Sequence, residues 1–175
     1  NRTFFKMKLH IGGLQKKEGW KILNIQTGPG VDYIGDILNL DQFQDESIEE
    51  IYASHVLEHV KQKDVLKTLK EINRKLIKGG KFYVSVPDMD VLCKLFISPK
   101  ATPKIKIHVM KMMFGGQIDD YDFHYFGWNY QFLSGFLKDA NFSKINKVEK
   151  FGMFEDTSEY KPYGIMISLN VIAIK

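Results

Sequence analysis

The chain has 175 residues, of which 44% are hydrophobic and 26% are charged. These values are typical of globular proteins, and the length suits a single domain over residues 1–175. The formal net charge of +4 is scattered along the chain without an arginine-rich run. This pattern favours a solvated basic surface and no nucleic-acid partner.

Cysteine content and hydrophobic run lengths indicate the compartment. Cys93 is the one cysteine in the sequence, so no internal disulfide can form and a reducing compartment is expected. The apolar neighbours of Cys93 predict a small core residue. No apolar run is long enough to span a membrane, and residues 1–8 lack the apolar stretch of a signal peptide. We therefore expect a cytoplasmic protein without a membrane span.

Short apolar runs alternate with helical patterns along the whole chain, which favours βα units and a mainly parallel sheet. The final run, residues 166–174, is apolar at nearly every position, as in a central strand, and fits a strand inserted antiparallel among its neighbours. The expected strands are residues 8–11, 22–25, 31–35, 50–53, 81–86, 144–150 and 165–175. The expected helices are residues 64–78, 90–96, 104–114 and 129–139.

Two helices carry recognisable end signals. Asp64 is expected to cap the first one, whose apolar residues recur at i, i+4, i+7 and i+11 from Val65. Gly79 and Gly80 are expected to close it. Asn129 is expected to cap the helix over residues 129–139.

The first crossover is unusually short. Only residues 12–21 separate the first two predicted strands, whereas a parallel crossover usually needs a dozen residues or more. The first helix of the fold is therefore expected to be reduced or missing.

Four segments, in this order and spacing, resemble motifs of the class I S-adenosylmethionine (SAM) dependent methyltransferases, in their "type 11-like" branch. The segments are KLHIGG (8–13), VDYIGDILNL (31–40), IYASHVLEHV (51–60) and LIKGGKF (76–82). The resemblance covers residues 8–87 well and continues more loosely beyond them. There, FEDTS (154–158) and ISLNV (167–171) are similar to a small subgroup of predicted bacterial methyltransferases, and GGQ (115–117) with FH (123–124) resembles a substrate-side loop of methyltransferases in polysaccharide metabolism.

The resemblance implies a three-layer, Rossmann-like α/β fold and SAM as cofactor. It also implies methyl transfer to an oxygen or nitrogen of a small molecule or a sugar or polysaccharide precursor. A homodimer is compatible with the sequence. The residues expected to bind the cofactor are Gly12, Gly13, Asn24, Asp36, Ile37, Ser54 and His55.

Three positions depart from the family pattern. His10 stands where an acidic residue is usual, and Leu14 where a further glycine is usual. Asn24 replaces the carboxylate that grips the ribose, and a neutral amide makes weaker hydrogen bonds than a charged group. These departures, with the short first crossover, support an alternative, a catalytically inactive methyltransferase-like binding or scaffold protein.

A loop over residues 115–126 contains His124 among aspartates and aromatic residues. An imidazole that titrates near neutral pH suits removal of a proton from the acceptor, so His124 is the first candidate base, with His55 or His59 behind it. In the purely structural alternative, the aromatic residues cover the sheet and the carboxylates are solvated.

The sequence His55-x-x-Glu58-His59 fits the pattern of inverted zinc peptidases. The segment follows a strand directly and is too short for a zinc-site helix, so a zinc-dependent hydrolase is the less favoured alternative and no metal is assigned. A third interpretation makes both histidines structural, at the strand–helix junction.

Overall fold

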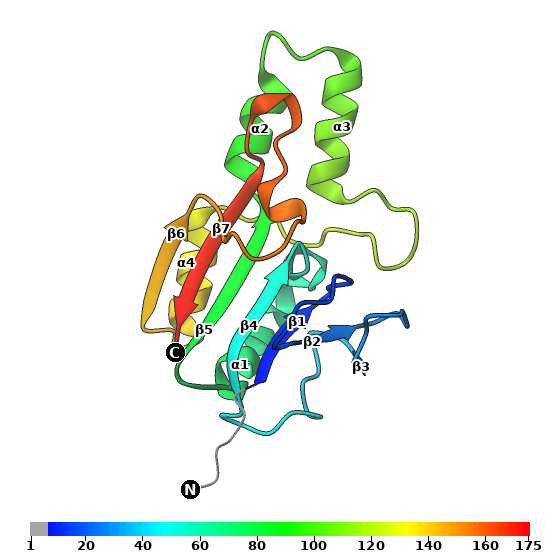
Figure 1. Cartoon of the computed structure of the whole chain (residues 1–175). Helices are drawn as coiled ribbons and strands as arrows, with labels where there is room; N and C mark the ends of the chain where they lie inside the picture. The colour runs from blue at the N-terminus through cyan, green and yellow to red at the C-terminus, as the bar shows by residue number, and fades with distance from the viewer. Residues whose placement is uncertain (1–6) are drawn as a thin grey trace, which may run out of the picture.

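The computed structural model describes residues 7–175, which form one seven-stranded sheet (Figure 1). The strand order is β3-β2-β1-β4-β5-β7-β6, with β7 antiparallel to β5 and β6 and the other pairs parallel. The α/β fold with a mainly parallel sheet and an antiparallel final strand is therefore confirmed. The strands are β1 (Met7–Ile11), β2 (Trp20–Asn24), β3 (Tyr33–Ile34), β4 (Ile48–Ser54), β5 (Leu76–Pro87), β6 (Lys144–Val148) and β7 (Ser168–Ile174).

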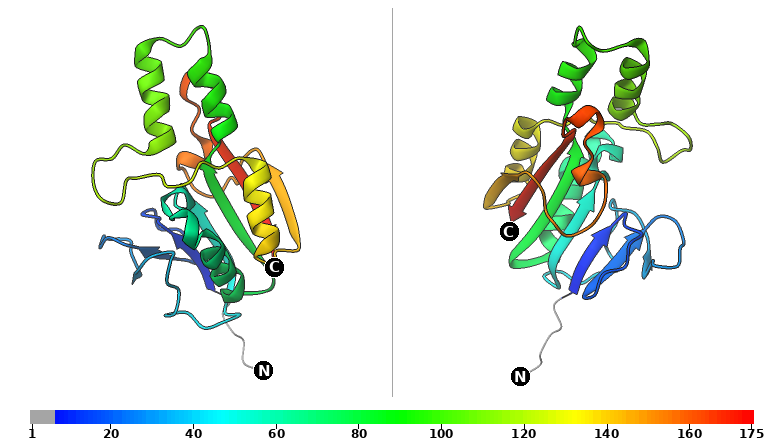
Figure 2. Two further views of the ribbon diagram at one scale, coloured as in Figure 1. Left: turned by 180° about the vertical axis from the view of Figure 1, so that it is seen from behind. Right: turned by 45° about the horizontal axis from the view of Figure 1, so that its top comes forward.

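Helices cover one face of the sheet (Figure 2). On that face lie α1 (Val65–Lys75) and α4 (Tyr130–Asp139), whose apolar stripes pack into the main core. The pair α2 (Met89–Ile97) and α3 (Pro103–Phe114) extends beyond the end of β5 (Figure 1). As expected, Asn129 caps α4, because its Oδ1 accepts a hydrogen bond from the Phe132 amide.

The opposite face carries a loop where the sequence predicted a third layer of the fold. Residues 149–167 cross this face and contain only two short 3₁₀ turns, η3 (Thr157–Glu159) and η4 (Pro162–Gly164). Phe154 anchors the loop in a small aromatic core with Trp20, Tyr52 and Tyr83. The Tyr52 hydroxyl also donates to Asp156 at 2.7 Å.

The connections on the β1–β2–β3 side contain no helix. Residues 12–19 link β1 to β2 through turns alone, which confirms the expected loss of the first helix. The backbone amide of Gly12 donates to the Leu23 carbonyl at 2.8 Å and so fixes the end of β1 against β2. The carboxyl ends of these strands are therefore bordered by short loops.

Two local predictions are wrong. The first helix ends at Lys75, and Gly79 and Gly80 lie inside β5, where Gly79 has a φ of +77°. A Cβ on Gly80 would meet the Ile77 carbonyl at 2.9 Å, so these glycines serve an irregular strand start. Cys93 is exposed, because α2 buries Leu92 and Leu95 on the opposite side. Asp64 holds the N-cap position of α1 without a side-chain cap bond.

Residues 1–6, part of the segment interpreted as too polar for a signal peptide, lie outside the described residues. Within residues 7–175, no helix is both long and apolar enough to cross a membrane.

His10, the departure from the family's acidic residue, is buried in the aromatic core. Its ring lies 4.2 Å from that of Phe154 and 4.9 Å from that of Tyr52, measured between centroids. Burial lowers the pKa of His10 from 6.5 to about 4, although the Asp156 charge partly opposes this. His10 is therefore neutral in the folded protein at pH 7.

We predict that His10 makes the protein less stable in acid. As pH falls from 6.5 to about 4, the unfolded chain takes up a proton that the folded chain excludes. The free energy of unfolding should therefore drop by about 3 kcal/mol across this window from His10 alone. Urea unfolding of the wild type and of His10→Leu at several pH values measures the difference. If the free energy of unfolding fell equally with decreasing pH in the two proteins, the prediction would be contradicted.

Candidate functional site

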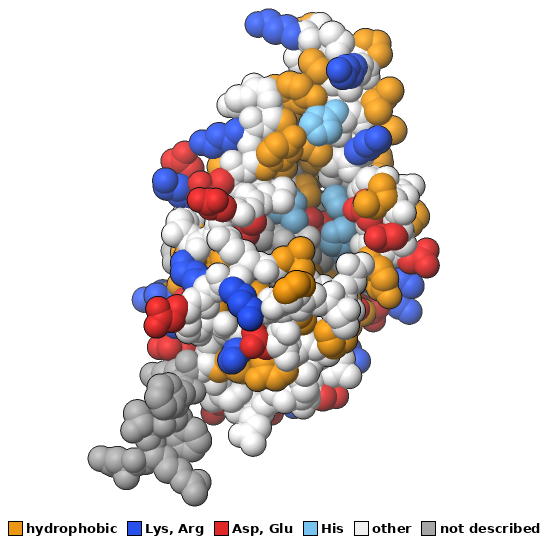
Figure 3. Space-filling model, turned by 45° about the vertical axis from the view of Figure 1, so that its right-hand side comes forward, with side chains coloured by type: hydrophobic (Ala, Val, Ile, Leu, Met, Phe, Trp, Pro, Cys, Tyr) orange, Lys and Arg blue, Asp and Glu red, His pale blue; other side chains and the backbone are white. Residues whose placement is uncertain are grey.

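A cavity of about 310 Å³ opens at the carboxyl ends of β1, β2 and β4. Ligands of open α/β sheets bind at this edge, and small-molecule sites begin at about this volume. Histidine side chains lie in the hollow seen in Figure 3. The residues predicted from the sequence that line the cavity are Gly12, Asn24, Asp36, Ile37, His55 and His59.

Asn24 ends β2, and neighbouring backbone groups hold its side chain in place. Its Nδ2 donates to the Gly13 carbonyl at 3.0 Å, and its Oδ1 accepts from the Gln26 amide at 3.0 Å. A carboxylate could not donate the first of these bonds. The amide at this position therefore ties the loop after β1 to the end of β2.

Asp36 follows β3 and has one carboxylate oxygen available. Its Oδ1 accepts from the Leu38 amide at 3.0 Å and shapes the turn, while Oδ2 makes no hydrogen bond with another residue in 7–175. The adjacent Ile37 is buried and also lines the cavity. Asp36 therefore shapes the turn with one carboxylate oxygen and keeps the other as an acceptor without a partner in residues 7–175.

The glycines after β1 are required by the protein's own side chains. Gly12 has a φ of +76°, and a Cβ there would lie 2.6 Å from a Val56 methyl group. A Cβ on Gly13 would lie 2.4 Å from Nδ1 of His10, and Gly13 does not line the cavity. Gly12 and Gly13 were both expected to bind the cofactor, but Gly12 alone of the two lines the cavity, and Gly13 makes room for the His10 ring.

His55 is held in a strained backbone conformation at the end of β4, with a φ of +53°. Its amide donates to the Ser85 carbonyl at 2.8 Å. Its Nε2 lies 2.8 Å from Oγ of Ser168, which in turn donates to the Thr157 carbonyl. The Ser168 hydroxyl donates its one proton to the Thr157 carbonyl, so Nε2 of His55 donates a hydrogen bond to Oγ of Ser168. Ser54 precedes His55 and does not line the cavity.

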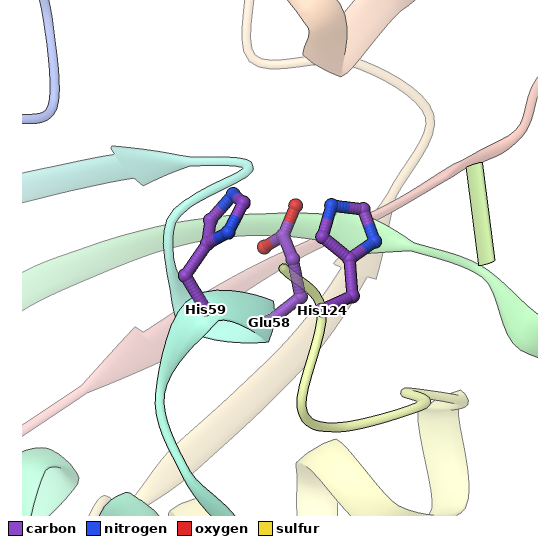
Figure 4. Close-up of side chains that lie close together, drawn as sticks. All are labelled: Glu58, His59 and His124. Carbon is purple, nitrogen blue, oxygen red and sulfur yellow. The ribbon is translucent and has the colours of Figure 1, made fainter. Parts of the chain in front are cut away.

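Glu58 lies at the centre of a histidine cluster beside the cavity. It belongs to the 3₁₀ turn η1 (Leu57–His59) and is 1% exposed. Its Oε1 lies 3.3 Å from Nδ1 of His55. Figure 4 shows its carboxylate between the rings of His59 and His124. The two imidazole rings lie edge to face, with centroids 4.8 Å apart.

The electrostatics of the cluster favour a charged carboxylate. Burial alone would raise the pKa of Glu58, but the contact with His55 and the charges of the three histidines bring it below its ordinary value. Burial lowers the pKa of His124, and the Glu58 charge opposes that effect.

The loop over residues 115–126 closes one side of the cavity. Asp120, Tyr121 and Tyr125 line the cavity, as the aromatic composition of the loop suggested. Asp119 and Asp122 bond to backbone amides and shape the turns of the loop. Two other aromatic residues of this region pack inward and join the core: Phe126 and Trp128.

His124 does not line the cavity, although its ring centroid lies 4.8 Å from that of His59, which does. Proton removal by His124 therefore stays a prediction, whereas His55 and His59 do border the cavity. Tyr121 and Tyr125 belong to the aromatic loop that the sequence singled out, and both line the cavity. The sequence interpretation missed Ser168, which no local pattern could connect with His55.

Comparison with known proteins agrees with this fold. Residues 16–84 match a family model described as "Methyltransferase domain". A SAM-dependent methyltransferase structure from Archaeoglobus fulgidus has a TM-score of 0.61 and 13% identity, over 98% of this chain and 88% of that one. The search of curated proteins found no match.

Two further structures come from proteins with named substrates. The 1,6-didemethyltoxoflavin-N1-methyltransferase of Burkholderia thailandensis, with bound S-adenosylhomocysteine, has a TM-score of 0.59 and 13% identity, over 97% of this chain and 71% of that one. The phosphoethanolamine N-methyltransferase 2 of Haemonchus contortus, in complex with S-adenosyl-L-methionine, has a TM-score of 0.51 and 15% identity. The match covers 82% of this chain and 34% of that one. The resemblance to the class I SAM-dependent methyltransferases is confirmed at the level of the fold.

We predict that Gly13 is required because of His10. Gly13→Ala should cost about 1–3 kcal/mol of unfolding free energy through overpacking against the imidazole. In a His10→Ala background most of that cost should disappear, because the clashing ring is gone. Denaturant unfolding of the four proteins gives the coupling energy.

Gly135→Ala on α4 is the matched control, because nothing lies within 4 Å of a Cβ there. It should have the same small effect in both backgrounds. An equal cost of Gly13→Ala with and without the His10 ring would show that another constraint demands the glycine.

Proposed function

We propose that the chain is a SAM-dependent methyltransferase that acts on an oxygen or nitrogen of a small molecule or sugar. The observation that carries the proposal is the cavity at the carboxyl edge of β1, β2 and β4, in a chain whose residues 16–84 match a methyltransferase domain. Relatives in fold have been crystallised with SAM or S-adenosylhomocysteine. One of them is named as an N1-methyltransferase.

In this proposal, Asp36 recognises the adenine. Its unpaired Oδ2 would accept a hydrogen bond from the adenine amino group, while buried Ile37 offers an apolar surface to the ring. Asn24 would reach the ribose with weaker bonds than a carboxylate, because its amide is engaged with Gly13 and Gln26. The expected affinity is therefore moderate.

The acceptor would enter beside His55, His59 and the two lining tyrosines, Tyr121 and Tyr125. Methyl transfer is an in-line displacement in which an acceptor lone pair forms the new bond to carbon as the sulfur–carbon bond breaks. S-adenosylhomocysteine leaves, and the acceptor loses a proton. The protein's main contribution to such a step is positioning and exclusion of water.

One observation supports the alternative of an inactive binding protein. Both polar groups of the Asn24 side chain are already bonded within the chain, at the position where related proteins grip the ribose. Loss of SAM binding with a retained cavity would leave a scaffold that binds another small molecule. A titration of the protein with SAM separates the two functions.

We predict that SAM binds with micromolar affinity, about −8 kcal/mol, in a calorimetric titration. Asp36→Asn should weaken binding at least tenfold, because it keeps the Oδ1 bond to Leu38 but replaces the free acceptor by a donor. Asp139→Asn, at the end of α4 and away from the cavity, is the control and should bind like the wild type. No heat at millimolar SAM would refute the methyltransferase proposal and favour the binding protein.

A further inference from the structure

Glu58 has a buried carboxylate that the protein alone does not satisfy. Both oxygens are buried, and neither has an aligned hydrogen-bond partner among residues 7–175. The nearest imidazole nitrogen, Nδ1 of His55, lies 3.3 Å from Oε1 without that alignment. Buried polar groups nearly always have partners, so a buried unpaired carboxylate indicates a missing ligand.

Two imidazoles beside Glu58 have one nitrogen fixed by the backbone. Nδ1 of His59 lies 3.1 Å from the Phe123 carbonyl, and Nδ1 of His124 lies 3.1 Å from the Met112 carbonyl. A carbonyl only accepts, so each Nδ1 carries a proton, and in the neutral imidazole each Nε2 then keeps a lone pair that a metal can take. Metal-ligating histidines typically have this arrangement, in which the distant nitrogen donates to a carbonyl.

The donor atoms of Glu58, His59 and His124 all lie within 4.8 Å of one another. Two imidazoles and one carboxylate form a donor set that suits zinc and non-haem iron, whereas magnesium prefers oxygen ligands. We propose that Glu58, His59 and His124 form a binding site for a divalent transition-metal ion, with Zn²⁺ as the ion tested first.

A small inward movement is needed to close this site. Tetrahedral ligand atoms about 2.0 Å from zinc lie about 3.3 Å from one another. The donor atoms of Glu58, His59 and His124 lie up to 4.8 Å apart. Glu58 and His59 come from a three-residue 3₁₀ turn, and His124 comes from a loop. Neither segment belongs to the sheet, so the movement would displace no strand.

This site differs from the inverted zinc peptidase pattern noted in the sequence. His55 is not one of the three donors, since its ring contacts Glu58 and Ser168. The third donor comes from the loop over residues 115–126, far along the chain. A metal-bound Nε2 of His124 cannot take a proton, so the site replaces the predicted role of His124 as a base.

The ion would fasten the loop to η1. The loop is already attached there through the Tyr125 amide, which donates to the Glu58 carbonyl at 2.8 Å, and through the His59–Phe123 contact. Metal binding would add ligand bonds across the same junction, so it should protect the loop from proteolysis and raise the melting temperature. Neither readout requires methyltransferase activity.

Calorimetric titration of tag-free, chelator-stripped protein with Zn²⁺, in the absence of SAM, tests the proposal. We expect one equivalent to bind with micromolar or tighter affinity and Mg²⁺ to give no comparable binding. His59→Ala and His124→Ala should each weaken Zn²⁺ binding at least 100-fold. His108→Ala on α3 is the matched control, because its ring contacts Tyr163 outside the cluster, and it should bind like the wild type.

Equal Zn²⁺ affinity in the wild type, His59→Ala and His124→Ala would overturn the proposal, as would no binding to the wild type. Because Glu58→Gln alters a buried charge, the histidine variants carry the test, with circular dichroism to verify their folding. A separate SAM titration of the metal-free protein keeps the two proposals distinguishable, since either ligand can bind without the other.

Discussion

The buried carboxylate of Glu58 is the constraint on which the arrangement of the site depends. The Glu58 side chain is 1% exposed, and the imidazoles around it come from the end of β4, from η1 and from the loop over residues 115–126. A buried charge without an aligned partner is strongly unfavourable, so this carboxylate calls for a ligand. The cluster therefore brings distant segments together at the edge of the cavity.

The same edge is shaped by the absence of helices after β1 and β2. Short turns leave the carboxyl ends of these strands open to a ligand, and the loop over residues 149–167 protects the far face through Phe154. His10 joins that aromatic core, and its ring explains why residue 13 is glycine. His10, which stands where related proteins carry an acidic residue, thus serves to pack the aromatic core. In the same region, the Asn24 side chain ties the loop after β1 to the end of β2.

The fold was largely predictable because its signals are local. Alternating apolar runs indicated the seven strands, the apolar run over 166–174 indicated β7, and the short interval after β1 indicated the lost helix. The end of α1 was not predictable, because Leu76 already belongs to a strand paired with β4. Cys93 was misplaced because its apolar neighbours face the other side of α2.

The site was predictable only where a motif spans a few residues. The sequence singled out Asp36, His55 and His59, which all line the cavity. It could not show that His124 shares a buried carboxylate with His59, or that Ser168 bonds His55, because these contacts join segments far apart in the chain. Tertiary contacts of this kind leave no periodic signal.

We propose that the cavity at the edge of β1, β2 and β4 holds the methyl donor. A crystal structure with S-adenosylhomocysteine tests it most directly. We expect the adenine amino group within hydrogen-bonding distance of Oδ2 of Asp36, with the sulfur toward His55 and His59. A nucleoside bound elsewhere on the chain, or no bound ligand at saturating concentration, would contradict it.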